Sequence, residues 1–179
     1  MALTATIYNF EIQLSDVDRG VYETLSFRAA RQPSETEEYL VTRVLAFCLE
    51  HTEGIEFTKG LAEPDTPAIV ARDLTGALRV WVEIGSPDAD RLHKASKASP
   101  RVVVYTHKDA GTLLRQLEGA RIHRAESLEI HAIDRGLIDA LVARLDRRTN
   151  LELAVTENHL YVTIGGETLD GAVTVHKLG

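Results

Sequence analysis

The feature that most constrains the fold is a short turn between two apolar segments in the middle of the chain. The tetrapeptide Asp73-Leu74-Thr75-Gly76 separates residues 68–72 from residues 78–84. Aspartate opens type I turns, and glycine readily takes the left-handed position that follows in a three-residue hairpin loop. The sequence therefore predicts an antiparallel hairpin, in which Asp73 acts first as a turn former.

The turn also predicts which residues of the hairpin face each other. Pairing of Asp73 with Ala77 would place Glu83 opposite Pro67. Side chains alternate along a strand, so Asp65 and Glu83 become diagonal neighbours whose backbones are about 7 Å apart. Two carboxylates at that spacing suit a hard divalent cation such as Mg²⁺ or Mn²⁺. This register predicts a metal site made by Asp65 and Glu83.

The rest of the chain alternates between strand and helix patterns. Alternating apolar residues predict an N-terminal hairpin over residues 5–27, and a helical apolar stripe follows Ser34, which together with Glu37 forms a capping box. Further helices are expected near residues 88–98, 110–117 and 136–145, and further strands near 55–58, 101–106, 128–133 and 151–178. The pattern predicts an α/β fold in which helices flank a mixed β-sheet, with residues 1–179 as a single domain.

Composition restricts the class of protein. The net charge of −7 argues against a strong nucleic-acid binder, because neutralising phosphates supplies most of that affinity. No apolar run approaches the ~18 residues that span a membrane, and residues 1–6 do not resemble a signal peptide. The single cysteine, Cys48, excludes an intramolecular disulfide and fits a reducing compartment. We expect a cytoplasmic protein without membrane contact, and its partners are either nucleic acid or other proteins.

Glu83 stands out because it ends the apolar run Val80-Trp81-Val82 in what should be a central strand. A buried carboxylate must be paired with a cation, hydrogen-bonded or bound to metal, because an unpaired buried charge is too costly. An ion pair with Arg79, Arg91 or Lys94 explains Glu83 as well as a metal does.

Two helix-borne residues are weaker candidates. Glu38 lies three residues before Val41 on the apolar stripe, which carries it toward the sheet. The simpler interpretation is a half-buried glutamate bonded to Arg43 or to backbone. Lys94 shares a helix stripe with Arg91, and a lysine in such a position is most often solvated.

Several motifs of the chain resemble the bacterial YaeQ family. They are the first eight residues, Pro33-Ser34-Glu35-Thr36, Phe57-Thr58-Lys59-Gly60-Leu61, Asp73-Leu74-Thr75-Gly76, and Trp81-Val82-Glu83-Ile84-Gly85-Ser86-Pro87-Asp88 followed by Arg91 and Lys94-Ala95. The resemblance spans essentially the whole chain, and Trp-x-Glu-x-Gly-x-Pro-Asp is its most specific part. The family has no settled biochemical function and is similar in fold to the restriction-endonuclease-like superfamily.

That resemblance implies a restriction-endonuclease-like core at about residues 34–106, with extra strands at both ends of the chain. It also implies a variant of the PD-(D/E)xK site, in which two acids hold the metal and a lysine polarises the attacking water. Pro64-Asp65 and Glu83 keep the acidic positions, whereas Gly85 replaces the lysine.

The glycine at position 85 means that any catalytic amine must come from elsewhere in the chain. The resemblance implies that Lys94, on the following helix, supplies it, with Lys97 as the alternative. Glu38 then corresponds to the extra acid that such folds often carry in the first helix.

Three interpretations stay open at this point. The first is a Mg²⁺-dependent phosphodiesterase acting on DNA or RNA. The second is a non-catalytic binding or regulatory module that retains a degenerate nuclease-like scaffold. The third is a structural ion-pair cluster of Glu83, Arg91 and Lys94. The missing lysine at position 85 favours a degenerate site over an active one.

Overall fold

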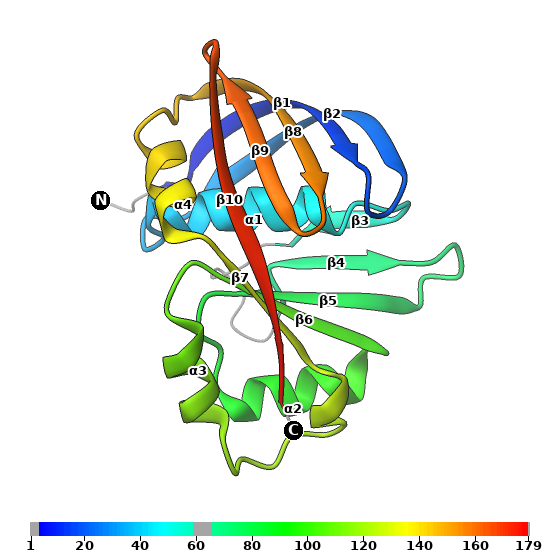
Figure 1. Cartoon of the computed structure of the whole chain (residues 1–179). Helices are drawn as coiled ribbons and strands as arrows, with labels where there is room; N and C mark the ends of the chain where they lie inside the picture. The colour runs from blue at the N-terminus through cyan, green and yellow to red at the C-terminus, as the bar shows by residue number, and fades with distance from the viewer. Residues whose placement is uncertain (1–3, 59–65, 179) are drawn as a thin grey trace.

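The computed structural model describes residues 4–58 and 66–178 of the chain. These residues form a nearly barrel-shaped mixed sheet in the strand order β2-β1-β8-β9-β10-β7-β6-β5-β4-β3, together with four α-helices (Figure 1). The predicted α/β class with a mixed sheet is confirmed. The strands are β1 (Thr6–Asp16), β2 (Val21–Arg31), β3 (Ile55–Phe57), β4 (Ile69–Arg72), β5 (Leu78–Ile84), β6 (Arg101–Thr106), β7 (Glu129–Ile133), β8 (Arg148–Thr156), β9 (His159–Ile164) and β10 (Glu167–Lys177).

Strand β10 joins two halves of the sheet. Its residues 167–172 pair with β9, and its residues 173–177 pair with β7. Strands β1, β2, β8 and β9 form a strongly curved half on one side of β10, and β3 to β7 form a flatter half on the other (Figure 1). The two ends of the chain therefore build the curved half, and the middle of the chain builds the flat half.

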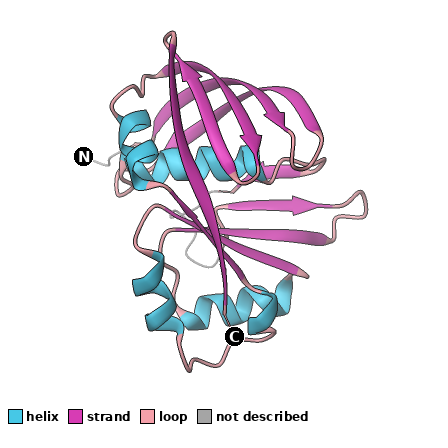
Figure 2. Ribbon diagram, in the orientation of Figure 1, coloured by secondary structure: helices cyan, strands magenta, loops and turns pink. Residues whose placement is uncertain are grey.

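Helix α1 (Glu37–Leu49) lies between the two halves (Figures 1 and 2). Its N-cap is Thr36, whose hydroxyl accepts a hydrogen bond from the Tyr39 amide at 3.0 Å. The predicted cap at Ser34 is wrong, because the first helical residue is Glu37 and the cap must directly precede it. All of residues 40–49 are buried. A helix that is buried on every side needs elements packed all around it, and the two halves of the sheet supply them.

Polar contacts hold α1 to both halves. Within the first half of the helix, Arg43 Nη2 donates to the Ala30 carbonyl of β2 at 2.6 Å and lies 3.3 Å from the Glu35 carboxylate. At the other end, Glu50 accepts a hydrogen bond from the Tyr105 hydroxyl of β6 at 2.6 Å and pairs with Arg101 at 3.1 Å. These contacts fix the helix relative to both halves of the sheet.

The flat half is covered on both faces. Val103 and Tyr105 belong to the core around α1, whereas Val102 and Val104 pack with α2 (Ala89–Ala98) and α3 (Ala110–Leu117). This burial on both faces explains the unbroken apolar run in β6. The fourth helix, α4 (Arg135–Val142), packs beside α1. No helix in the described part of the chain is long and apolar enough to cross a membrane.

The turn between β4 and β5 forms as predicted. The Asp73 amide donates to the Ala77 carbonyl at 3.0 Å, and the Asp73 carboxylate accepts from the Thr75 amide at 2.9 Å. Gly76 has a φ of +86°, in the left-handed region that the loop requires. Asp73 is thus a turn former, and its carboxylate organises the loop.

The predicted register of this hairpin is correct beside the turn and wrong farther along. A β-bulge at Arg79 adds one residue to β5, so Ile69 faces Val82 where the unbroken register would place Trp81. Bulges of this kind increase the local twist of a hairpin, and the added twist contributes to the curvature of the sheet. Asp65, the other half of the predicted acid pair, lies outside the described residues.

Truncation of a core residue of α1 tests whether the helix supports the whole sheet. Leu45 is 1% exposed, and Leu45→Ala should lower the free energy of unfolding by about 2–5 kcal/mol, because it leaves a cavity between the two halves. Leu74, at the tip of the hairpin, is 92% exposed and provides the matched control Leu74→Ala. This control should change the free energy of unfolding by less than about 0.5 kcal/mol. Chemical denaturation measures both. Equal effects of the two substitutions would contradict a central role for α1.

Candidate functional site

Glu83 is a buried carboxylate on the face of the flat half that α2 and α3 cover. It is 4% exposed, and its strand neighbours Val82 and Ile84 point to the opposite face, toward α1. Alternation along β5 places Trp81 and Glu83 on the same face. A carboxylate at this depth requires hydrogen-bond donors.

Arg91 and Trp81 supply those donors. Arg91 Nε lies 2.9 Å from each carboxylate oxygen of Glu83, and Trp81 Nε1 donates to Oε1 at 2.7 Å. Arg91 stands in the first turn of α2, where the Asp88 carboxylate caps the helix by accepting from the Arg91 amide at 2.8 Å. The guanidinium also donates to the Thr66 carbonyl. We call Trp81, Glu83 and Arg91 the Glu83 site.

Burial raises the pKa of Glu83, while the hydrogen bonds from Arg91 and Trp81 act in the opposite direction. An ion pair is one of the two explanations for a carboxylate at position 83. This ion pair is present, and its cation is Arg91. The pair joins β5 to the start of α2. It also binds the chain that enters β4, through the Thr66 carbonyl.

The two lysines lie outside this arrangement. Lys94 and Lys97 are both exposed on α2, and neither makes an ion pair with any residue that the structure describes. The structural cluster thus contains Glu83 and Arg91 without Lys94. The proposed role of Lys94, with Lys97 as its alternative, stays a prediction.

Glu38 is half-buried on α1, which packs against the other face of the flat half. No hydrogen bond or ion pair within the described residues joins its side chain to Glu83 or to Arg43, which pairs instead with Glu35. Burial, together with the charges of Glu35 and Glu83, raises the pKa of Tyr39 to about 12.

His107 directly follows the last residue of β6. It is buried, and its Nδ1 atom has no hydrogen-bond partner among the described residues. Burial lowers the pKa of His107, as do the charges of Arg135 and Lys108, whereas Glu38 raises it. His107 thus lies at the carboxyl end of the parallel strand β6, and Glu38 is one of the charges that act on it. In the sequence, the only sign that His107 could be a functional residue is its position directly after a buried strand.

Gly85 occupies the lysine position of the variant motif for a structural reason. Its φ is +89°, in the left-handed region that side chains other than glycine rarely adopt. A Cβ atom built on it would lie 3.9 Å from Cε2 of Tyr39, so the available space is ordinary and the backbone is the constraint. A lysine at position 85 would therefore strain the backbone where β5 ends.

The comparisons with known proteins agree with the motifs. The model of the YaeQ protein family matches residues 1–173. The chain belongs to the YaeQ family. It is 28% identical over 175 residues to the uncharacterized protein YaeQ of Escherichia coli strain K12, covering 97% of each chain. It is 27% identical to that of Salmonella typhi, over the same share of each chain.

Two solved structures of the family have the same fold. The crystal structure of YaeQ from Xanthomonas axonopodis pv. citri is similar with a TM-score of 0.89 at 31% identity, over 98% of this chain and 100% of that one. The crystal structure of YaeQ from Pseudomonas syringae is similar with a TM-score of 0.87 at 27% identity, over 98% and 97%. The function of this family is unsettled, so an activity must be argued from the site itself.

A glycine substitution tests the explanation of position 85. Gly85→Ala should lower the free energy of unfolding by about 1–2 kcal/mol, because alanine is strained in the left-handed region. The matched control is Gly111→Ala in α3, where the backbone is helical and the nearest contacts are flexible side-chain ends. That control should be neutral or stabilising. A neutral Gly85→Ala would contradict the backbone explanation.

Proposed function

We propose that this chain is a non-catalytic binding or regulatory module that retains a nuclease-like scaffold. The observation that carries the proposal is the state of Glu83, whose two oxygens accept hydrogen bonds from Arg91 and Trp81. In the nuclease interpretation this carboxylate holds a metal ion. In this structure it neutralises an arginine.

The element order supports the scaffold part of the proposal. Helix α1 is followed by β3, β4 and β5, which form an antiparallel meander, and then by α2 and β6, which pairs with β5 in parallel. The sequence pattern predicts this order of helix, strand, strand, strand, helix and strand for the same part of the chain, where the resemblance places the nuclease-like core. The strands of the curved half are additions to that core.

The described residues of the Glu83 site do not suit Mg²⁺ or Mn²⁺. A divalent cation on Glu83 would share its carboxylate with the guanidinium of Arg91, whose Nε atom lies 2.9 Å from both oxygens. Like charges repel strongly at such distances inside a protein. Lys94 is solvated and Glu38 lies across the sheet, so neither completes a metal-binding or water-activating group with Glu83.

One observation favours the second candidate function, hydrolysis of phosphodiesters with a divalent metal. Arg91 binds the Thr66 carbonyl, and Thr66 follows Asp65 in the sequence. Metal binding by Asp65 and Glu83, assisted by Lys94, therefore stays the competing proposal. The net charge of −7 opposes nucleic acid as its substrate and favours a protein partner for the binding module.

Metal titration separates the two functions. Calorimetry with Mg²⁺ and with Mn²⁺ should give the same small heats for the wild-type protein, Glu83→Ala and Lys94→Ala, because Glu83 is committed to Arg91. The same three proteins should cleave neither plasmid DNA nor single-stranded RNA with either ion.

The outcome that contradicts the binding module is specific. It is a saturable metal-binding heat, together with cleavage, that Glu83→Ala abolishes in a variant whose circular dichroism shows a folded chain. Lys94 is exposed, so Lys94→Ala should fold normally. Loss of cleavage in that variant, with metal binding retained, would assign the lysine its catalytic role.

A further inference from the structure

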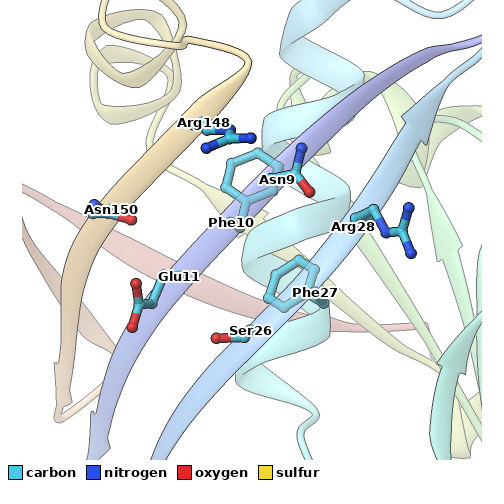
Figure 3. A pocket seen from close by; sticks show the side chains of 8 residues that line it. All are labelled: Asn9, Phe10, Glu11, Ser26, Phe27, Arg28, Arg148 and Asn150. Atoms are coloured by element: carbon cyan, nitrogen blue, oxygen red, sulfur yellow. The ribbon is translucent and has the colours of Figure 1, made fainter.

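The outer face of the curved half carries two rows of polar side chains across β2, β1 and β8 (Figure 3). Alternation along each strand sends the intervening Phe10 and Phe27 inward, where their rings stack with centroids 5.6 Å apart. The first row is Arg28, Asn9 and Arg148, and the second row is Ser26, Glu11 and Asn150. Aligned strands thus present their polar side chains in register.

Both rows line a hollow of about 520 Å³. A second hollow of about 340 Å³ shares Glu11 and Asn150 with the first and continues to Gln13, Glu152 and Thr163. We call the two together the outer polar trough. It covers parts of β2, β1 and β8 and reaches β9. Along the strands, the row with the two arginines lies at one end, Glu11 lies in the middle and Glu152 lies at the other end.

The charged side chains of the trough have no partners among the described residues. Neither Arg28 nor Arg148 makes an ion pair or side-chain hydrogen bond with any residue that the structure describes, and the same holds for Glu11 and Glu152. Figure 3 shows Glu11 apart from both guanidinium groups, although they line one hollow. By contrast, Arg144 on the same half pairs with Glu167 at 2.6 Å. The trough therefore offers opposite charges to a ligand.

We propose that the outer polar trough binds an extended segment of a partner protein, in which an acidic side chain is followed two positions along by a basic one. The two rows are two residues apart along β1, or about 6.6 Å, which is also the distance between same-side residues of an extended chain. An acidic side chain over the Arg28–Asn9–Arg148 row thus places a basic one over Glu11. Asn9, Asn150 and Ser26 provide hydrogen bonds for the backbone of the segment.

Charge and lining favour a protein over a nucleic acid as the occupant. Glu11 and Glu152 would repel phosphates, and the whole chain carries a net charge of −7. Stacking of bases requires exposed rings, and the two rings that line the trough, Phe10 and Phe27, pack toward the core. Tyr22 and Tyr161 lie on the same outer face and are 62% and 43% exposed. Along the strands they are two residues beyond the end of the trough that Gln13 and Glu152 form. Tyrosine and arginine are enriched at protein interfaces.

A defined peptide tests the proposal. The probe is fluorescein-labelled Thr-Glu-Thr-Lys-Thr with blocked ends, and its control places the glutamate and lysine side by side, so that they point to opposite sides. Fluorescence anisotropy with the full chain should show saturable binding of the probe and weaker binding of the control. Because exposed ion pairs are weak and screened, binding should also weaken as salt rises.

Charge reversal locates the binding. The double variant Arg28→Glu with Arg148→Glu should bind the probe about tenfold or more weakly than the wild-type protein. It should instead prefer a peptide that contains Lys-Thr-Lys. The matched control, Arg79→Glu with Arg121→Glu, makes the same change of charge at exposed sites outside the trough. It should bind the probe with the same affinity as the wild-type protein.

Three results would overturn the proposal. The first is that the wild-type protein shows no saturable binding of the probe. The second is that the two double variants lose the same amount of affinity for the probe. The third is that the wild-type protein binds labelled oligo-dT and that only the trough variant loses this binding. This proposal rests on the proposed binding role but not on the Glu83 site. Metal-dependent cleavage would therefore contradict the proposed function and leave the peptide result standing.

Discussion

Burial of α1 between the two halves of one sheet is the constraint on which the rest of the structure depends. The helix is buried along residues 40–49, so apolar residues from both ends and from the middle of the chain must pack against it. Strand β10 makes this enclosure continuous, because it pairs with β9 in one half and with β7 in the other. Both candidate regions, the Glu83 site and the outer polar trough, are held by elements that pack around or beside this core.

The Glu83–Arg91 pair shows how such a scaffold limits chemistry. Removing a carboxylate from water is costly, and the cost is tolerated only when a cation and further donors satisfy its oxygens. Arg91 is placed for this by the Asp88 cap of α2, and Trp81 by the alternation of β5. The same contacts that make a buried glutamate tolerable occupy the oxygens that a metal ion needs. The fixed geometry of the Glu83–Arg91 pair therefore favours a structural role for Glu83 over a role as a catalytic acid.

Local patterns predicted the elements well, because turns and caps depend on neighbouring residues. The Asp73 turn, α2, α3 and β6 lie within a few residues of their predicted positions, and β8, β9 and β10 occupy the C-terminal region in which further strands are predicted. Contacts between distant elements were harder to predict. The bulge at Arg79 changes the register without a glycine or proline to mark it, and the face on which α1 packs separates Glu38 from Glu83. Periodicity shows that a helix has a buried face, but not which face of a sheet receives it.

A double-mutant cycle on Glu83 and Arg91 tests the central claim most directly. Their side chains are 6% and 30% exposed, so Arg91→Leu leaves a buried carboxylate without its cation and should lower the free energy of unfolding by about 3 kcal/mol. Glu83→Leu should cost less, and the double variant should cost less than the sum of the two, with a coupling of at least about 1.5 kcal/mol. Losses that add to within about 0.5 kcal/mol would show that Glu83 is not committed to Arg91. Its carboxylate would then be available for a metal ion.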